Sequence, residues 1–173
     1  MQVCVRELRR EEIPLLREFL YQAIFVPEGQ RPPAPDILDT PEFQVYLQNF
    51  GEEPHDCAFA AVAGEKVVGA AWARVMEDFG HLYEGVPSLA ISLLPESRGK
   101  GVGAALLQGL LNALKQRGEP GVTLSVQREN RRAVGLYCKL GFTVAVEKED
   151  EYILWKDLRR AEREEDAYAG RTL

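Results

Sequence analysis

The chain has 173 residues, the size of one domain, and is long enough to bury a hydrophobic core without disulfides or a metal. Its 21 basic and 27 acidic residues give a net charge of -6 without a basic stripe, so we expect no nucleic-acid partner. The first residues lack a signal-peptide pattern, and no apolar stretch is long enough to span a bilayer, so we expect no membrane partner.

Cysteine usage indicates the compartment. Cys4, Cys57 and Cys138 are odd in number, far apart in sequence and mostly set in apolar stretches. This pattern is typical of reduced thiols in a core, so we expect a cytoplasmic protein. Only His55 and Cys57 approach the spacing of metal ligands, and we therefore expect no bound metal.

The first half of the chain predicts a strand, two helices and a hairpin. Apolar residues recur at every second position in the strands and at helical spacing in the helices. The proline-rich stretch 26–40 predicts a surface loop, either beside a substrate entrance or as a linker between helices. In order, the elements are strand 2–8, helix 10–25, loop 26–40, helix 41–50, and strands 56–63 and 66–75 joined by the two-residue turn Gly64-Glu65.

The second half alternates strands and helices. Its elements are loop 76–86, an apolar central strand 89–94, helix 101–118, strand 121–127, helix 130–140, and a closing hairpin of strands 142–148 and 152–156. The whole order, βααβββαβαββ, predicts an α+β domain in three layers, with a mixed sheet of about seven strands and four helices. A crossover through helix 101–118 makes two of the strands parallel. We expect one domain over residues 1–157 and a charged tail over 158–173.

A glycine-rich turn joins the central strand to the helix after it. Gly99, Gly101 and Gly103 alternate within Arg98-Gly99-Lys100-Gly101-Val102-Gly103-Ala104. Glycines allow a ligand close to the backbone, and the first amides of a helix have no partner within it. Free N–H groups and the positive end of the helix dipole both favour an anion, so this turn predicts a pyrophosphate cradle.

The same turn also fits other patterns. Gly99-x-Gly101-x-x-Ala104 satisfies the dinucleotide-binding pattern, with Glu129 at a distance suited to a ribose contact. Only 44 residues follow Glu129, too few for the second half of a dinucleotide fold. A Walker P-loop is excluded, because Gly99-Lys100 is followed by Gly101 rather than Ser or Thr.

Two motifs resemble those of the GCN5-related N-acetyltransferase (GNAT) family. Arg98-x-x-Gly101-x-Gly103 is similar to the acyl-CoA motif Gln/Arg-x-x-Gly-x-Gly/Ala of that family. Asn130-x-x-Ala133-x-x-Leu-Tyr137-x-x-x-Gly-Phe142 is similar to a second sequence motif of that family. The two motifs are separated by the helix and strand that the fold of the family requires. The resemblance covers about residues 1–157 and implies an acetyl-CoA-dependent N-acetyltransferase.

The resemblance also implies which residues bind acetyl-CoA as cosubstrate. Backbone groups of the central strand would pair with the pantetheine arm, the amides of the glycine turn would hold the pyrophosphate, and Asn130 and Tyr137 would lie near the pantetheine and its sulfur. The implied binding residues are Ser92, Leu93, Leu94, Arg98, Gly99, Lys100, Gly101, Val102, Gly103, Ala104, Asn130 and Tyr137.

Attack of an amine on a thioester builds charge on the carbonyl oxygen and then on the sulfur. A backbone N–H can serve the oxygen, and we expect the Tyr137 hydroxyl to act as general acid for the sulfur. Transfer is then direct, within a ternary complex, because holding both reactants together supplies much of the acceleration. A nucleophilic Cys138 is not expected, since it points about 100 degrees away from Tyr137 on a helix.

The sequence constrains the identity of the catalytic base less than that of the acid. Similar relatives often carry a glutamate where this chain has Ser88. Deprotonation of the amine then falls to water or to a loop residue (Glu77, Asp78, His81 or Glu84), with Glu84 taken as the base here. Ser88 also keeps open a catalytically silent acyl-CoA sensor. The acceptor is a small-molecule or peptide amine, and the sequence leaves monomer and homodimer open.

Overall fold

The computed structural model describes residues 2–159 and arranges seven strands of that range in one sheet. Their order across the sheet is β1-β2-β3-β4-β5-β7-β6, and every neighbouring pair is antiparallel except β4 and β5. The strands are β1 (Val3–Glu7), β2 (Cys57–Ala63), β3 (Lys66–Arg74), β4 (Ser88–Leu93), β5 (Gly121–Gln127), β6 (Thr143–Glu147) and β7 (Glu151–Asp157). The predicted α+β fold and element order are confirmed.

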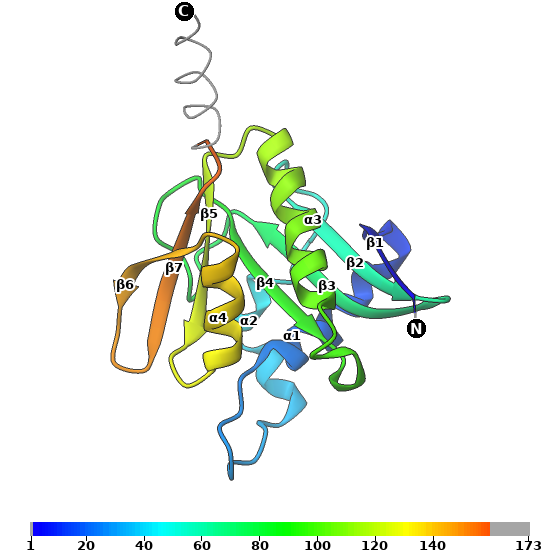
Figure 1. Ribbon diagram of the computed structural model, residues 1–173, viewed down its shortest axis with the longest axis horizontal. Helices are drawn as coiled ribbons and strands as arrows, with labels where there is room; N and C mark the ends of the chain where they lie inside the picture. The colour runs from blue at the N-terminus through cyan, green and yellow to red at the C-terminus, as the bar shows by residue number, and fades with distance from the viewer. Residues whose placement is uncertain (1, 160–173) are drawn as a thin grey trace, which may run out of the picture.

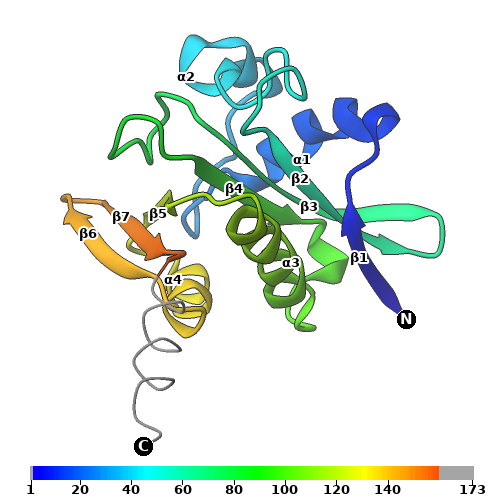
Figure 2. The ribbon, with the colours of Figure 1, turned by 90° about the horizontal axis from the view of Figure 1, so that it is seen from above.

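Helices cover both faces of the sheet. In Figure 2, α1 and α2 lie on one face, and α3 and α4 lie on the opposite face. The helices are α1 (Leu16–Ala23), α2 (Pro41–Gln44), α3 (Val102–Gln116) and α4 (Arg131–Lys139), with short 3-10 helices η1 (Arg10–Leu15), η2 (Pro35–Asp39) and η3 (Pro95–Ser97). The molecule therefore has three layers.

Two predicted helices are shorter than expected. The one over 10–25 begins as the 3-10 helix η1, because Pro14 lacks the N–H that an α-helical bond to Arg10 would need. The one over 41–50 ends its α-helical part at Gln44 and continues as turns. The predicted loop 26–40 is irregular except for η2.

Each face of the sheet has its own core. On the α3 side, Leu106, Leu107, Leu110 and Leu114 are fully buried, which is what the i, i+4 apolar stripe predicts. On the other side, fully buried Trp72 of β3 is central to a second apolar cluster formed with α1 and α2. The sheet is therefore packed against an apolar core on each face.

The prediction of three core thiols is wrong for two of them. Cys57 is buried at the start of β2, whereas Cys4 and Cys138 are exposed. Cys4 faces outward because alternate residues of β1, an edge strand, point away from the core.

The parallel strands β4 and β5 touch at one end only. Ser88 opposite Thr123 is their single paired position, and beyond it the strands separate, as Figure 1 shows. Directly after β4, the Leu94 amide donates to the Val68 carbonyl of β3. Backbone groups alternate along a strand, so those of Ile91 and Leu93 point the other way, into the gap. The splay thus leaves these backbone groups of β4 without a neighbouring strand to pair with.

Candidate active site

A cleft of about 1200 Å³ passes through the splay between β4 and β5. The glycine turn and α4 border it on one face of the sheet, and α1, the proline-rich loop and α2 border it on the other. Nine of the predicted binding residues line it: Ser92, Leu93, Arg98, Gly99, Gly101, Gly103, Ala104, Asn130 and Tyr137. Leu94, Lys100, Val102 and Glu84 are not among the lining residues.

The glycine turn opens α3 with free amides. Gly101 is the N-cap residue with φ 78°, a left-handed conformation that favours glycine. The Ala105 amide donates to the Gly101 carbonyl at 3.2 Å as the first helical bond, so the amides of residues 102–104 have no partner within the helix. This geometry fits a pyrophosphate, whose oxygens accept hydrogen bonds from such amides.

Basic side chains surround the turn, but two of them are already tied to the protein. Arg98 donates to the Leu93 carbonyl at 3.1 Å and to the Gln22 side chain at 3.1 Å, and Lys100 donates to the Glu96 carbonyl at 2.8 Å. Both therefore also brace the turn.

Arg132 is a cleft residue that the sequence analysis did not single out. Its guanidinium group lies against Gly99, where a Cβ would come within 2.6 Å of it. The sequence feature that could have pointed to Arg132 is its position inside the second motif, two residues after Asn130. In the sequence alone, that position is indistinguishable from an ordinary exposed position of a helix.

The central strand presents both backbone and side-chain groups. Ser92 is buried, and its hydroxyl donates to the Phe19 carbonyl at 2.5 Å, which fixes α1 against β4. Leu94 uses its amide within the sheet. Ile91 and Leu93 are therefore the positions of β4 whose backbone groups face the cleft.

Tyr137 of α4 lies at the wall of the cleft. Only 8% of the residue is exposed, and its ring packs edge to face on Phe142 with centroids 5.8 Å apart. Burial raises the pKa of Tyr137 to about 12, so its hydroxyl stays protonated at neutral pH. At the start of the same helix, the Asn130 side chain accepts a hydrogen bond from the Ala133 amide at 3.3 Å, as an N-cap does.

Of the loop carboxylates, Asp78 is the one that lies beside the cleft wall. Glu84 is exposed on a turn. Asp78 accepts a 2.7 Å hydrogen bond from the hydroxyl of Tyr46, a cleft-lining residue just after α2. Burial raises the pKa of Asp78 despite the nearby Tyr46 and Ser88 hydroxyls, and burial together with the Asp78 charge raises the pKa of Tyr46.

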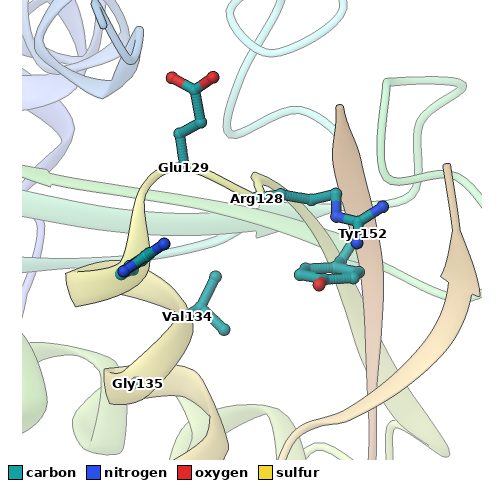
Figure 3. A pocket seen from close by; sticks show the side chains of 6 residues that line it. Arg128, Glu129, Val134, Gly135 and Tyr152 are labelled. Carbon is teal, nitrogen blue, oxygen red and sulfur yellow. The ribbon is translucent and has the colours of Figure 1, made fainter. Parts of the chain in front are cut away.

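A second pocket, of about 750 Å³, adjoins the cleft at α4 and β7. Figure 3 shows Arg128 above the ring of Tyr152, and the distance from its guanidinium carbon to the ring centroid is 5.0 Å. Glu129 points away from that pair in the figure. Arg131 and Gly135 line both the cleft and the second pocket, so the second pocket is a side branch of the cleft.

Comparison with known proteins decides the family. A model of the acetyltransferase (GNAT) family matches residues 21–142, which include both motifs and most of the cleft. The chain belongs to the GNAT family. A mycothiol acetyltransferase of Thermobifida fusca is 38% identical over 80 residues, which span 44% of this chain and 25% of that relative.

Solved structures agree in fold. The PaiA N-acetyltransferase from Thermoplasma acidophilum, determined in complex with coenzyme A, has a TM-score of 0.67 and 20% identity, and covers 91% of this chain and 99% of its own. YncA from Salmonella typhimurium, determined with its cofactor acetyl-CoA, has a TM-score of 0.64 and 18% identity over 91% of this chain and 95% of its own.

Two further observations concern metals and membranes. Among residues 2–159, no three His, Cys, Asp or Glu side chains gather in a way that could hold a metal ion. Within the same range, no helix combines the length and the apolar character needed to cross a membrane.

Proposed function

We propose that this GNAT acetyltransferase moves an acetyl group from acetyl-CoA directly to a primary amine in a ternary complex. One observation carries the proposal: a single cleft runs from the free amides at the start of α3 to Tyr137 and on to the opposite face of the sheet. Two reactants that enter from opposite faces can meet in such a passage. When bound, acetyl-CoA supplies the acetyl thioester.

The cofactor end of the cleft suits a phosphate-bearing molecule. Amides of residues 102–104 donate to the pyrophosphate, and Arg132 adds positive charge beside Gly99. The backbone groups of Ile91 and Leu93 pair with the pantetheine arm as an added strand would. Asn130 keeps its capping bond and presents the rest of its side chain to the cleft.

The chemical step needs one donor at the carbonyl oxygen and one at the sulfur. An N–H of β4 that faces the gap donates to the oxygen as negative charge develops there. The amine nitrogen bonds to the carbonyl carbon while the carbon–sulfur bond breaks, and the Tyr137 hydroxyl gives its proton to the leaving sulfur. The nitrogen that has formed the new bond releases its surplus proton to water, and water returns one proton to Tyr137, so no protein group stays modified.

Direct transfer predicts a particular kinetic pattern. Initial rates measured with both substrates varied should give intersecting reciprocal plots, and mass spectrometry of the protein with acetyl-CoA alone should show no added acetyl group. Parallel plots together with an acetylated Cys138 would contradict direct transfer. The curated relative named mycothiol acetyltransferase matches only over a quarter of its length, so its name does not fix the acceptor.

A further inference from the structure

The chain after α2 is held in place by two side chains of β3. The indole nitrogen of Trp72 donates to the Tyr46 carbonyl at 3.2 Å, and Arg74 donates to the carbonyls of Val45 and Gln48 at 3.2 and 2.8 Å. Arg74 is itself buried and paired with Asp56 at 3.1 Å. Three hydrogen bonds thus fix the turn that carries Tyr46.

The loop between β3 and β4 is fixed in the same region. A Cβ on Gly80 would lie 2.9 Å from the amide nitrogen of Ser125, so this loop packs directly on the backbone of β5. That contact holds Asp78, two residues earlier, against the Tyr46 hydroxyl. The other carboxylate oxygen of Asp78, Oδ1, is buried and has no hydrogen-bond partner among residues 2–159.

The chain therefore places a tyrosine and a carboxylate in series beside the cleft. We propose that Tyr46 and Asp78 form a proton relay that deprotonates the acceptor ammonium group, an inference that rests on the proposed function. The Tyr46 oxygen takes a proton from the ammonium while its own hydroxyl proton passes to Asp78. The neutral amine then attacks the thioester, and Asp78 returns its proton to water after the product leaves.

The protonation states suit this sequence of transfers. Because the pKa of Tyr46 is raised, its hydroxyl is protonated at rest and donates to Asp78, which leaves its oxygen lone pairs for the ammonium group. The raised pKa of Asp78 makes its carboxylate a stronger base than an exposed one.

Ser88 is part of the same arrangement. It is fully buried, and its hydroxyl lies 3.1 Å from the Thr123 hydroxyl where β4 and β5 meet. Asp78 is close enough for the Ser88 hydroxyl to lower its pKa against the effect of burial. The relay thus places a carboxylate next to Ser88, at the end of β4 where it meets β5.

The walls around Tyr46 indicate the class of amine. Phe43 and Phe79 pack edge to face with centroids 5.7 Å apart, both line the cleft, and Phe79 is 42% exposed. Aromatic walls beside Tyr46 favour an amine on an aromatic or aliphatic stem.

The test compares two amines that differ in basicity. 2-Phenylethylamine needs deprotonation at neutral pH, whereas the fluorines of 2,2-difluoro-2-phenylethylamine lower the pKa of its ammonium group. We expect Asp78→Asn and Tyr46→Phe each to lower kcat/KM for 2-phenylethylamine by about 100-fold or more. For the fluorinated amine we expect a much smaller loss, because a large share of that amine is already neutral.

Matched controls separate the relay from folding and from cofactor binding. Glu65→Gln removes an exposed carboxylate from the β2–β3 turn, and Tyr83→Phe removes an exposed loop hydroxyl, so both should keep full activity. Calorimetry should give unchanged acetyl-CoA affinity for Asp78→Asn and Tyr46→Phe. If Asp78→Asn does not fold, Tyr46→Phe makes the same comparison, since it keeps the ring and its packing.

Each contrary result has a distinct meaning. Equal losses for the two amines would overturn the relay and make Asp78 and Tyr46 structural. Tight acetyl-CoA binding without acetylation of either amine by the unaltered protein would overturn the relay and its acceptor class while leaving the proposed function intact. Absence of acetyl-CoA binding would overturn the proposed function and the relay with it.

Discussion

Tyr137 is the residue whose role depends most directly on its surroundings. With its pKa raised to about 12, the hydroxyl stays protonated throughout the neutral range, and the residue lines the cleft. We predict that Tyr137→Phe lowers kcat by about 100-fold to 10,000-fold, the usual contribution of a positioned acid. Affinity for acetyl-CoA, measured by calorimetry, should change little, because the ring still packs on Phe142.

The neighbouring residue supplies a control for this prediction. Cys138→Ser changes the adjacent, exposed side chain and should leave kcat unaltered. If Tyr137→Phe keeps its turnover under conditions where chemistry limits the rate, the tyrosine is only a core residue and the assignment of the acid is wrong.

Gly101 tests the phosphate cradle. At φ 78° a β-branched side chain is strained by about 1 to 3 kcal/mol, and here the strain falls on the turn that aims the amides. We predict that Gly101→Val raises the dissociation constant for acetyl-CoA about 10-fold to 100-fold, as measured by calorimetry. Gly64→Val is a matched control, since Gly64 has φ 61° in the remote β2–β3 turn. If both variants bind alike, the cradle lies elsewhere.

At the scale of elements, hydrophobic periodicity predicted the bounds of an element best where the element buries a regular face. Strand 121–127 was predicted with its observed bounds, and the helix predicted over 101–118 is observed as α3 over 102–116. Local backbone chemistry explains why two helices were predicted to be longer than they are. Pro14 turned a predicted α-helical start into a 3-10 helix, and the carbonyls of Val45, Tyr46 and Gln48 accept hydrogen bonds from β3 side chains rather than continuing α2.

The 3-10 helix η1 is tied to β1 by one carboxylate. Glu12 accepts two hydrogen bonds from Arg6, at 2.7 and 2.8 Å, and one from the Arg9 amide at 2.8 Å. The Arg6 hydrogen bonds are the largest cause that lowers the pKa of Glu12 from its ordinary 4.5 to about 2. A lowered folded-state pKa stabilises the protein above pH 4.5, and this contribution is lost as the pH falls from 4.5 toward 2.

We predict that Glu12→Gln lowers the melting temperature at neutral pH and flattens its decline between pH 4.5 and 2. The loss in free energy of unfolding should be about 1 kcal/mol, the low end for a charge-assisted bond, because the pair is partly solvated. Glu11→Gln, an exposed neighbour, is the control. An unchanged acid slope in Glu12→Gln would show that the pair does not contribute to the acid dependence of stability.

At the scale of the whole molecule, the candidate site joins residues that no local pattern links. The cofactor half was accessible from the sequence because its residues sit in two contiguous motifs. The acceptor half was not, because Tyr46 and Asp78 are 32 residues apart and meet only when two irregular segments pack over the splay. The sequence analysis identified the loop that holds Asp78 and took Glu84 as the base, but burial within a loop leaves no periodic signal, so the burial of Asp78 was not predictable.

The charged segment at the end of the chain gives the last prediction. Every residue lining the cleft lies between Leu20 and Glu151, and the fold continues to Leu158, which is buried and donates its amide to the Pro120 carbonyl at 3.2 Å. Most of the predicted tail, residues 160–173, lies outside the described residues. We predict that deleting residues 161–173 leaves acetyl-CoA affinity and kcat unchanged.

A second deletion that also removes Leu158 should lower the free energy of unfolding by about 2 to 5 kcal/mol, because it empties a core position. Calorimetry and thermal melts of the two proteins check both halves of the prediction, and a drop in acetyl-CoA affinity in the shorter deletion alone would show that the end of the chain takes part in binding.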